Sequence, residues 1–143
     1  MIRPEDAEFH TPPSNDFRWC ETNPFLFNIP AARIAGVIYV VTRPVLGVCM
    51  SDITVCDRVT RSWEEQLYVD NQQHLPCPTS LLDYALPNGL SVRAVKPLEH
   101  YQVRYNGSDD TRIELEFRAL MPPFDMNDPA MDPMAAIRNR SRE

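Results

Sequence analysis

Hydrophobic and polar residues alternate along much of the chain with a period of two, which is typical of β-strands with one buried face. The clearest alternation spans residues 98–121, where the apolar positions are Tyr101, Val103, Tyr105, Ile113, Leu115, Phe117, Ala119 and Met121. All are odd-numbered, and a shift of one residue would turn a strand over, so the loop between the two strands needs an odd number of residues. We therefore predict a hairpin with its loop at 106–110. Tyr101, Tyr105 and Phe117 should point inward, while Arg104, Glu114 and Glu116 stay exposed.

Further strands are predicted at 17–29, 34–42, 46–57, 63–70 and 82–94. The first should be interrupted or bulged at Pro24, because proline cannot donate a hydrogen bond to a neighbouring strand. The run 34–42 shows little polar alternation, which predicts burial on both faces. Residues 71–80 are interpreted as a loop. Pro87, Asn88 and Gly89 supply the turn of a hairpin within 82–94.

The two ends of the chain show neither helical nor strand periodicity. Residues 1–16 are interpreted as an extended arm, and residues 122–143 as a linker rich in Pro and Met that begins a short helix near Asp132. Residues 17–121 form the predicted β domain. With 14 prolines against 4 glycines, the chain is unsuited to long helices.

The chain has 143 residues and a formal net charge of −6, with its basic residues scattered, so it lacks the basic surface that nucleic acids require. Its start resembles no signal peptide, and no apolar run is long enough to span a membrane. We therefore predict a soluble, cytoplasmic protein. In that reducing compartment the cysteines should be free thiols, namely Cys20, Cys49, Cys56 and Cys77.

No glycine loop for phosphates, nucleophile elbow or paired-cysteine zinc motif occurs, and the three histidines lie far apart. We predict neither cofactor nor metal. Glu21 shares a strand face with Trp19 and, beyond Pro24, with Phe27, and Asp52 follows Met50 on an otherwise apolar face. Both are candidate proton donors. The alternative for Glu21 is an ion pair with an arginine such as Arg43.

Three tyrosines are candidate ligand-lining residues together with Trp19 and Phe27. The hydroxyl groups of Tyr39, Tyr101 and Tyr105 would line a cavity. The alternative is that these tyrosines at alternating positions are core residues whose rings are buried and whose hydroxyls reach solvent.

Several short motifs resemble the first half of a tandem lipocalin-like family that includes uncharacterised bacterial proteins and hydroxyneurosporene synthase, a carotenoid hydratase. These motifs are Trp19-Cys20-Glu21-Thr22, Phe25-Leu26-Phe27, Gly36-Val37-Ile38-Tyr39, Leu86-Pro87-Asn88-Gly89-Leu90 and Leu98-Glu99-His100-Tyr101. The resemblance covers about residues 17–123. It implies two β-barrel-like halves that hold or act on long apolar molecules such as isoprenoids. The second half, with the family's more diagnostic polar motifs, has no counterpart here.

The resulting expectation is an all-β, antiparallel lipocalin-like half-barrel or curved sheet that binds an apolar small molecule, isoprenoid- or lipid-like. It would be a carrier, half of a hydratase- or isomerase-type enzyme, or a structural half without a ligand. The apolar face of the 98–121 hairpin has no helix in the chain to cover it. We therefore expect cover from a second lipocalin-like half or from a second copy in a homodimer.

Overall fold

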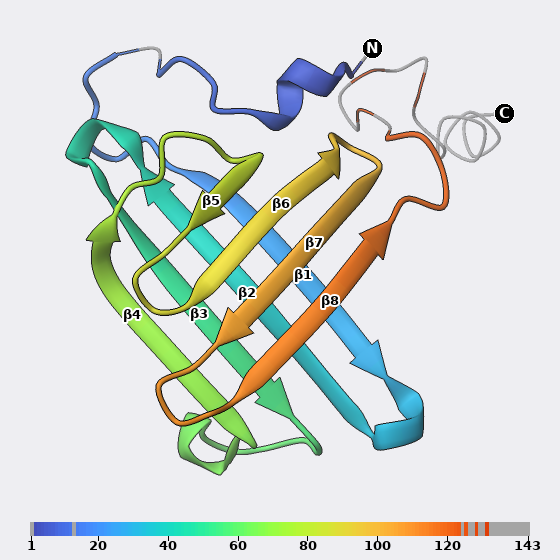
Figure 1. Cartoon of the computed structure of the whole chain (residues 1–143). Coiled ribbons are helices and arrows are strands. Elements are labelled where there is room, and N and C mark those ends of the chain that lie inside the picture. Colours follow the sequence, from blue (N-terminus) through green and yellow to red (C-terminus); the bar gives the residue numbers. More distant parts are fainter. Residues whose placement is uncertain (1, 13, 124, 126–127, 129–130, 132–143) are drawn as a thin grey trace, which may run out of the picture.

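The fold consists of eight antiparallel strands in two sheets of four (Figure 1). The computed structural model describes residues 2–12, 14–123, 125, 128 and 131. The first sheet contains β1 (Glu21–Ile29), β2 (Ile34–Arg43), β3 (Val48–Cys56) and β4 (Tyr68–Pro76), and the second contains β5 (Asp83–Ala85), β6 (Leu90–Lys96), β7 (His100–Asn106) and β8 (Arg112–Arg118). Within each sheet, every strand pairs with the next along the chain, and among the described residues no strand pairing joins the two sheets. The prediction of an all-β, half-barrel or curved-sheet fold is confirmed.

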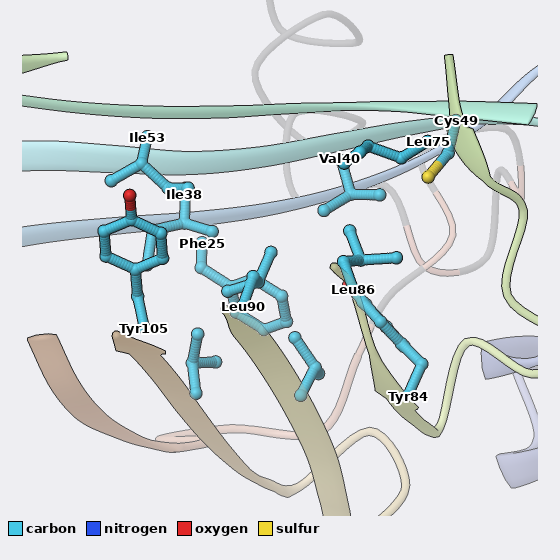
Figure 2. Close-up of a cluster of buried hydrophobic side chains, with 12 residues drawn as sticks. Phe25, Ile38, Val40, Cys49, Ile53, Leu75, Tyr84, Leu86, Leu90 and Tyr105 are labelled. Carbon is cyan, nitrogen blue, oxygen red and sulfur yellow. The ribbon is translucent and has the colours of Figure 1, made fainter. Parts of the chain in front are cut away.

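The two sheets face each other and share one hydrophobic core, with strands that cross in Figure 1. Figure 2 shows Ile38 and Ile53 of the first sheet pointing toward Tyr105 of the second, while Val40 lies opposite Leu86. The hairpin face that was expected to need a partner is therefore covered by the first sheet of the same chain. Sequence periodicity shows that a face is apolar, but it does not show which other face of the chain covers it.

The hairpin of β7 and β8 confirms the parity argument. Tyr105 pairs with Ile113, and the connecting loop has five residues, 107–111, one position later than predicted. Tyr105 is 1% exposed, Tyr101 and Phe117 pack partly buried against the core, and Arg104 is exposed, as are Glu114 and Glu116.

Three local predictions are wrong. Pro24 does not interrupt β1, because β1 lies at the sheet edge, where a missing N–H is tolerated. The predicted loop 71–80 lies largely within β4, which continues through a run of polar residues to Pro76. The segment before β4 is a short 3₁₀ helix, η4 (Trp63–Glu65), rather than a strand.

The prediction that 34–42 is buried on both faces holds for one face only. Ile38, Val40 and Thr42 are buried toward the second sheet, whereas Val37, Tyr39 and Val41 on the other side are half-exposed. We call this second side the outer face of the first sheet.

The N-terminal arm packs on the β domain. It begins with a short 3₁₀ helix, η1 (Pro4–Ala7), and Glu8 then accepts hydrogen bonds from the Ser80 hydroxyl at 2.5 Å and the Leu81 amide at 2.6 Å. In Figure 1 the arm runs along one end of the two sheets. The helix predicted near Asp132 lies outside the described residues. No helix among the residues that the structure describes has the length and apolar character to cross a membrane.

Candidate functional site

A polar cluster around Asp70 interrupts the apolar core where the two sheets meet. Asp70 lies in β4, and its Oδ2 accepts hydrogen bonds from the Tyr105 hydroxyl at 2.8 Å and from Asn88 Nδ2 at 3.3 Å. Its Oδ1 accepts one from Gln72 Nε2 at 3.0 Å. Asn88 Nδ2 also lies 3.0 Å from the buried Ser51 hydroxyl. The cluster thus joins β3 and β4 of the first sheet to the β5–β6 turn and β7 of the second.

Two tyrosines extend this cluster. The hydroxyl oxygens of Tyr68 and Tyr105 are 2.6 Å apart, and Tyr68 also lies 3.4 Å from Asp109 Oδ1. Burial raises the pKa of Tyr105, and its hydrogen bonds to Tyr68 and Asp70 raise it further. Burial likewise raises the pKa of Tyr68. Both phenols are therefore donors that stay protonated at neutral pH.

The hydrogen-bond directions favour a structural role for this cluster. Tyr105, Asn88 and Gln72 all donate to Asp70, so the carboxylate is satisfied from within the fold. A carboxylate that already accepts three hydrogen bonds has little capacity left for a substrate. The cluster explains how the two sheets are held together by polar contacts as well as by the core.

A groove opens on the outer face of the first sheet, beside β3 and β4. It has a volume of about 650 Å³, and we call it the Trp63 groove. Its walls include Asp52, Thr54, Trp63, Gln66, Val69 and Asn71. Trp63 is 68% exposed, which is unusual for the largest aromatic side chain. The loop between β3 and β4 carries Trp63 and Gln66 to the edge of the sheet.

Asp52 and Tyr39, both predicted as site residues, are direct cross-strand neighbours on the outer face. Asp52 Oδ1 accepts a hydrogen bond from the Thr54 hydroxyl at 2.9 Å. The side-chain oxygen of Gln66 is buried and has no hydrogen-bond partner among the described residues, while its Nε2 donates to Thr60 at 2.9 Å. The groove therefore combines an aromatic ring with a carboxylate.

Glu21, Trp19 and Phe27 lie elsewhere. Glu21 begins β1, and its carboxylate accepts the His10 backbone N–H at 2.7 Å and lies 2.9 Å from His10 Nδ1. The expected alternative for Glu21, a pair with Arg43, is wrong, because Glu21 pairs across the sheet with Thr42, and the residue after Thr42 faces the opposite side.

The two aromatic residues near Glu21 do not form a shared cavity wall with it. Trp19 precedes β1 half-buried, and its indole N–H is buried without a partner in the described part of the chain. Phe27 lies over Gly36, whose missing side chain leaves room for the ring. Tyr101 and Tyr105 belong to the core, with Tyr101 6.1 Å from Phe25 between ring centres.

The histidines occupy three separate places. His10 pairs with Glu21, His100 Nε2 lies 2.6 Å from Glu116 Oε1, and His74 lies in β4. Within the described residues no three His, Cys, Asp or Glu side chains gather in a way that would hold a metal ion. All four cysteines are free.

A family model matches residues 3–138 of the chain, under the description "Domain of unknown function (DUF7064)". The chain belongs to the DUF7064 family. No curated protein and no solved structure matches it. The family description names neither a lipocalin-like protein nor a carotenoid hydratase.

Several polar residues of this DUF7064 domain lie together in ways that local sequence pattern does not predict. The local pattern places Asp70 at a strand end and Asn88 in a turn, and nothing in it shows that the fold brings their side chains within 3.3 Å of each other. Trp63 was interpreted as part of an alternating strand, although its flanking residues, Ser62 and the two glutamates that follow, are also typical of a short helical turn. An exposed tryptophan in a polar segment was the available signal for the groove.

Proposed function

We propose that this domain binds a small amphipathic molecule in the Trp63 groove. The observation that carries the proposal is a groove of about 650 Å³ in which an exposed Trp63 stands beside Asp52. That volume lies within the range of small-molecule sites. The core between the sheets is occupied by side chains of both sheets, which makes the outer face the better place for a ligand.

The chemistry of the groove defines the ligand class. The ring of Trp63 and the side chain of Val69 offer apolar contact, whereas the Asp52 carboxylate offers acceptor oxygens. A ligand made only of hydrocarbon would leave these acceptors without partners, which costs free energy. The preferred molecule carries an apolar part together with a hydroxyl or amine donor, as an isoprenoid alcohol does.

The resemblance to carotenoid hydratases extends this proposal to catalysis. In a hydration, Asp52 in its protonated form would give a proton to one alkene carbon, and water would add to the other carbon and return a proton to the carboxylate. Asp52 is favoured over Glu21 as this donor, since the Glu21 carboxylate is held by His10. The free cysteines fit the proposed reducing, cytoplasmic location.

Calorimetric titration with geraniol, an isoprenoid alcohol, tests the binding proposal. Trp63→Ala and Asp52→Asn should each weaken binding about tenfold, while Leu67→Ala, an exposed apolar residue that is not part of the groove wall, should leave it unchanged. Equal affinity in Trp63→Ala and the parent protein would exclude this groove. If the domain is a hydratase, a product with one added water forms with the parent protein and not with Asp52→Asn.

A structural half-domain is the second candidate function, and a different observation favours it. The outer face over β1 to β3 presents Leu26, which is 69% exposed, beside the half-exposed Val37, Tyr39, Val41 and Met50. A second lipocalin-like half or a second copy would cover this apolar strip. Sedimentation at micromolar concentration should then show a dimer that Leu26→Asp converts to a monomer. A monomer in both proteins would remove this candidate for the chain alone.

A further inference from the structure

A second, smaller cavity lies on the outer face at the end of the first sheet where β2 turns into β3 and β4 ends. Its volume is about 240 Å³, and we call it the Arg43 cavity. Val41, Leu46 and Met50 form apolar walls, and Arg43 and His74 stand at its rim. None of the described residues that line it is acidic. In a chain with a net charge of −6, a cavity with an arginine, a histidine and no acid is a distinct local environment.

Arg43 is a cation without an acidic partner. Its side chain makes no ion pair or hydrogen bond with any described residue. Glu21, the acid that sequence places beside it, lies on the opposite side of the sheet and binds His10. A guanidinium stays charged at all physiological pH values and offers five N–H donors suited to carboxylates and phosphates. The register of β1 and β2 therefore keeps this donor free on the outer face.

A β-bulge brings His74 to the same cavity. Between the pairs Ser51–Gln72 and Cys49–Leu75, two residues of β4, Gln73 and His74, lie opposite the single residue Met50. His74 has a φ of 58°, in the left-handed region that costs most residues conformational energy. Bulges redirect side chains and recur beside functional sites. Here the bulge places His74 across the strand pair from Met50, and both residues line the cavity.

We propose that the Arg43 cavity binds the anionic head of a small amphiphile, a carboxylate or phosphate attached to a short aliphatic chain. The guanidinium of Arg43 and the imidazole of His74 donate to the head, and the chain lies along Leu46, Val41 and Met50. The apolar wall and the two donors together select an amphiphile. A free inorganic anion would make no contact with the apolar wall, and a neutral alkane would leave the two donors without an acceptor. This site is separate from the Trp63 groove and does not depend on the function proposed there.

The test compares four probes by NMR of methionine methyl groups, with the Met50 signal assigned through Met50→Leu. Octanoate carries head and tail, acetate carries the head alone, octanol carries the tail alone, and hexyl phosphate replaces the head group. Octanoate and hexyl phosphate should shift the Met50 methyl signal, and acetate and octanol should bind at least about tenfold more weakly. In Trp19→Phe, where Trp63 is the remaining tryptophan, the fluorescence should not change, which separates this site from the groove.

Variants of the two donors complete the test. Arg43→Gln should weaken octanoate binding about tenfold, and His74→Asn should weaken it while keeping a residue that tolerates the positive φ. Arg93→Gln removes the same charge from the exposed side of β6 and should have no effect.

Three results would overturn the proposal: no shift with octanoate, equal binding in Arg43→Gln, or octanol binding as tightly as octanoate. If acetate binds as tightly as octanoate, the site takes a free anion, and the assignment of an aliphatic chain is wrong.

Discussion

The hydroxyl oxygen of Tyr105 lies 2.8 Å from Oδ2 of Asp70, and this contact joins β7 of the second sheet to β4 of the first. No ladder of backbone hydrogen bonds connects the sheets in the described part of the chain, so their relative placement depends on side chains. Burial of the apolar core favours contact between the two faces but does not specify their orientation, because the hydrophobic effect is non-directional. The hydrogen bonds of the Asp70 cluster have a defined geometry and therefore specify how the sheets are placed. Tyr105 contributes to both, since its ring is buried in the core and its hydroxyl reaches the cluster.

Tyr105→Phe should therefore destabilise the domain by about 1–2 kcal/mol, because Tyr68 and Asp70 each lose a partner while the core packing is retained. Urea denaturation followed by circular dichroism measures the change. Tyr39→Phe is the matched control, as the Tyr39 hydroxyl makes no hydrogen bond with a described residue. In a double-mutant cycle, Tyr105→Phe and Asp70→Asn should not be additive. Additive effects would show that the contact carries no coupling.

Much of the fold follows from periodicity, and the hairpin of β7 and β8 shows why. Its odd-numbered apolar residues fix which face is buried and how many residues the loop contains. The second half of β4 is predicted as a loop because its polar run, 71–74, shows no apolar alternation. An ion pair between Glu21 and Arg43 is suggested by their positions at neighbouring strand ends. Glu21 pairs with Thr42, however, so Arg43 faces the opposite side of the sheet. Local hydrophobic pattern predicts the strands, whereas contacts between the sheets join residues that are far apart in the sequence.

The turn between β5 and β6 requires glycine for two reasons. Gly89 has a φ of 91°, and a Cβ there would lie 2.0 Å from the carbonyl oxygen of Asn106. Gly89 O also accepts a hydrogen bond from the Asn106 amide at 3.1 Å, so the two backbones cannot separate without losing this bond. Gly89→Ala should destabilise the domain by more than about 2 kcal/mol.

Gly47 provides the control for this substitution. Its φ of 67° is also positive, but a Cβ would meet nothing within 4 Å. Gly47→Ala should therefore cost only the backbone strain, about 1 kcal/mol. Thermal denaturation of the two variants measures the difference. Equal losses of stability would show that the contact with Asn106 adds nothing to the strain.

The four thiols should react with Ellman's reagent at different rates. Cys20 is exposed, whereas Cys49 is buried, and burial raises the pKa of the Cys49 thiol to about 11, with a further contribution from Cys77. Since the thiolate is the reactive form, Cys20 should react first and Cys49 only as fast as the domain unfolds. Cys20→Ser should remove the fast phase. All four thiols should react in denaturant without reductant, and fewer than four would indicate a disulfide.

Attachment of the N-terminal arm should be strongest in mildly acidic solution. The hydrogen bond and charge of Glu21 raise the pKa of His10 above 6.5, so this contact stabilises the arm fully below pH 6.5 and is lost as pH rises through the raised value. Burial of Glu8 would raise its pKa, but the Ser80 hydroxyl and the Leu81 and Phe9 amides outweigh this effect and lower it below 4.5. The Glu8 contact is therefore complete above pH 4.5 and is lost as pH falls through the lowered value.

Both contacts are complete between about pH 4.5 and pH 6.5. Limited proteolysis of residues 2–12 should be slowest in that window and faster on either side of it. His10→Gln should make cleavage on the alkaline side independent of pH while leaving the acid side unchanged, and Glu8→Gln should do the reverse. Arg18→Gln, which breaks an exposed pair with Asp16 outside the arm contacts, should leave the whole profile unchanged. If the cleavage rate of the parent protein does not vary with pH, the protonation of His10 and Glu8 does not affect release of the arm. These two contacts would then not hold the arm on the β domain.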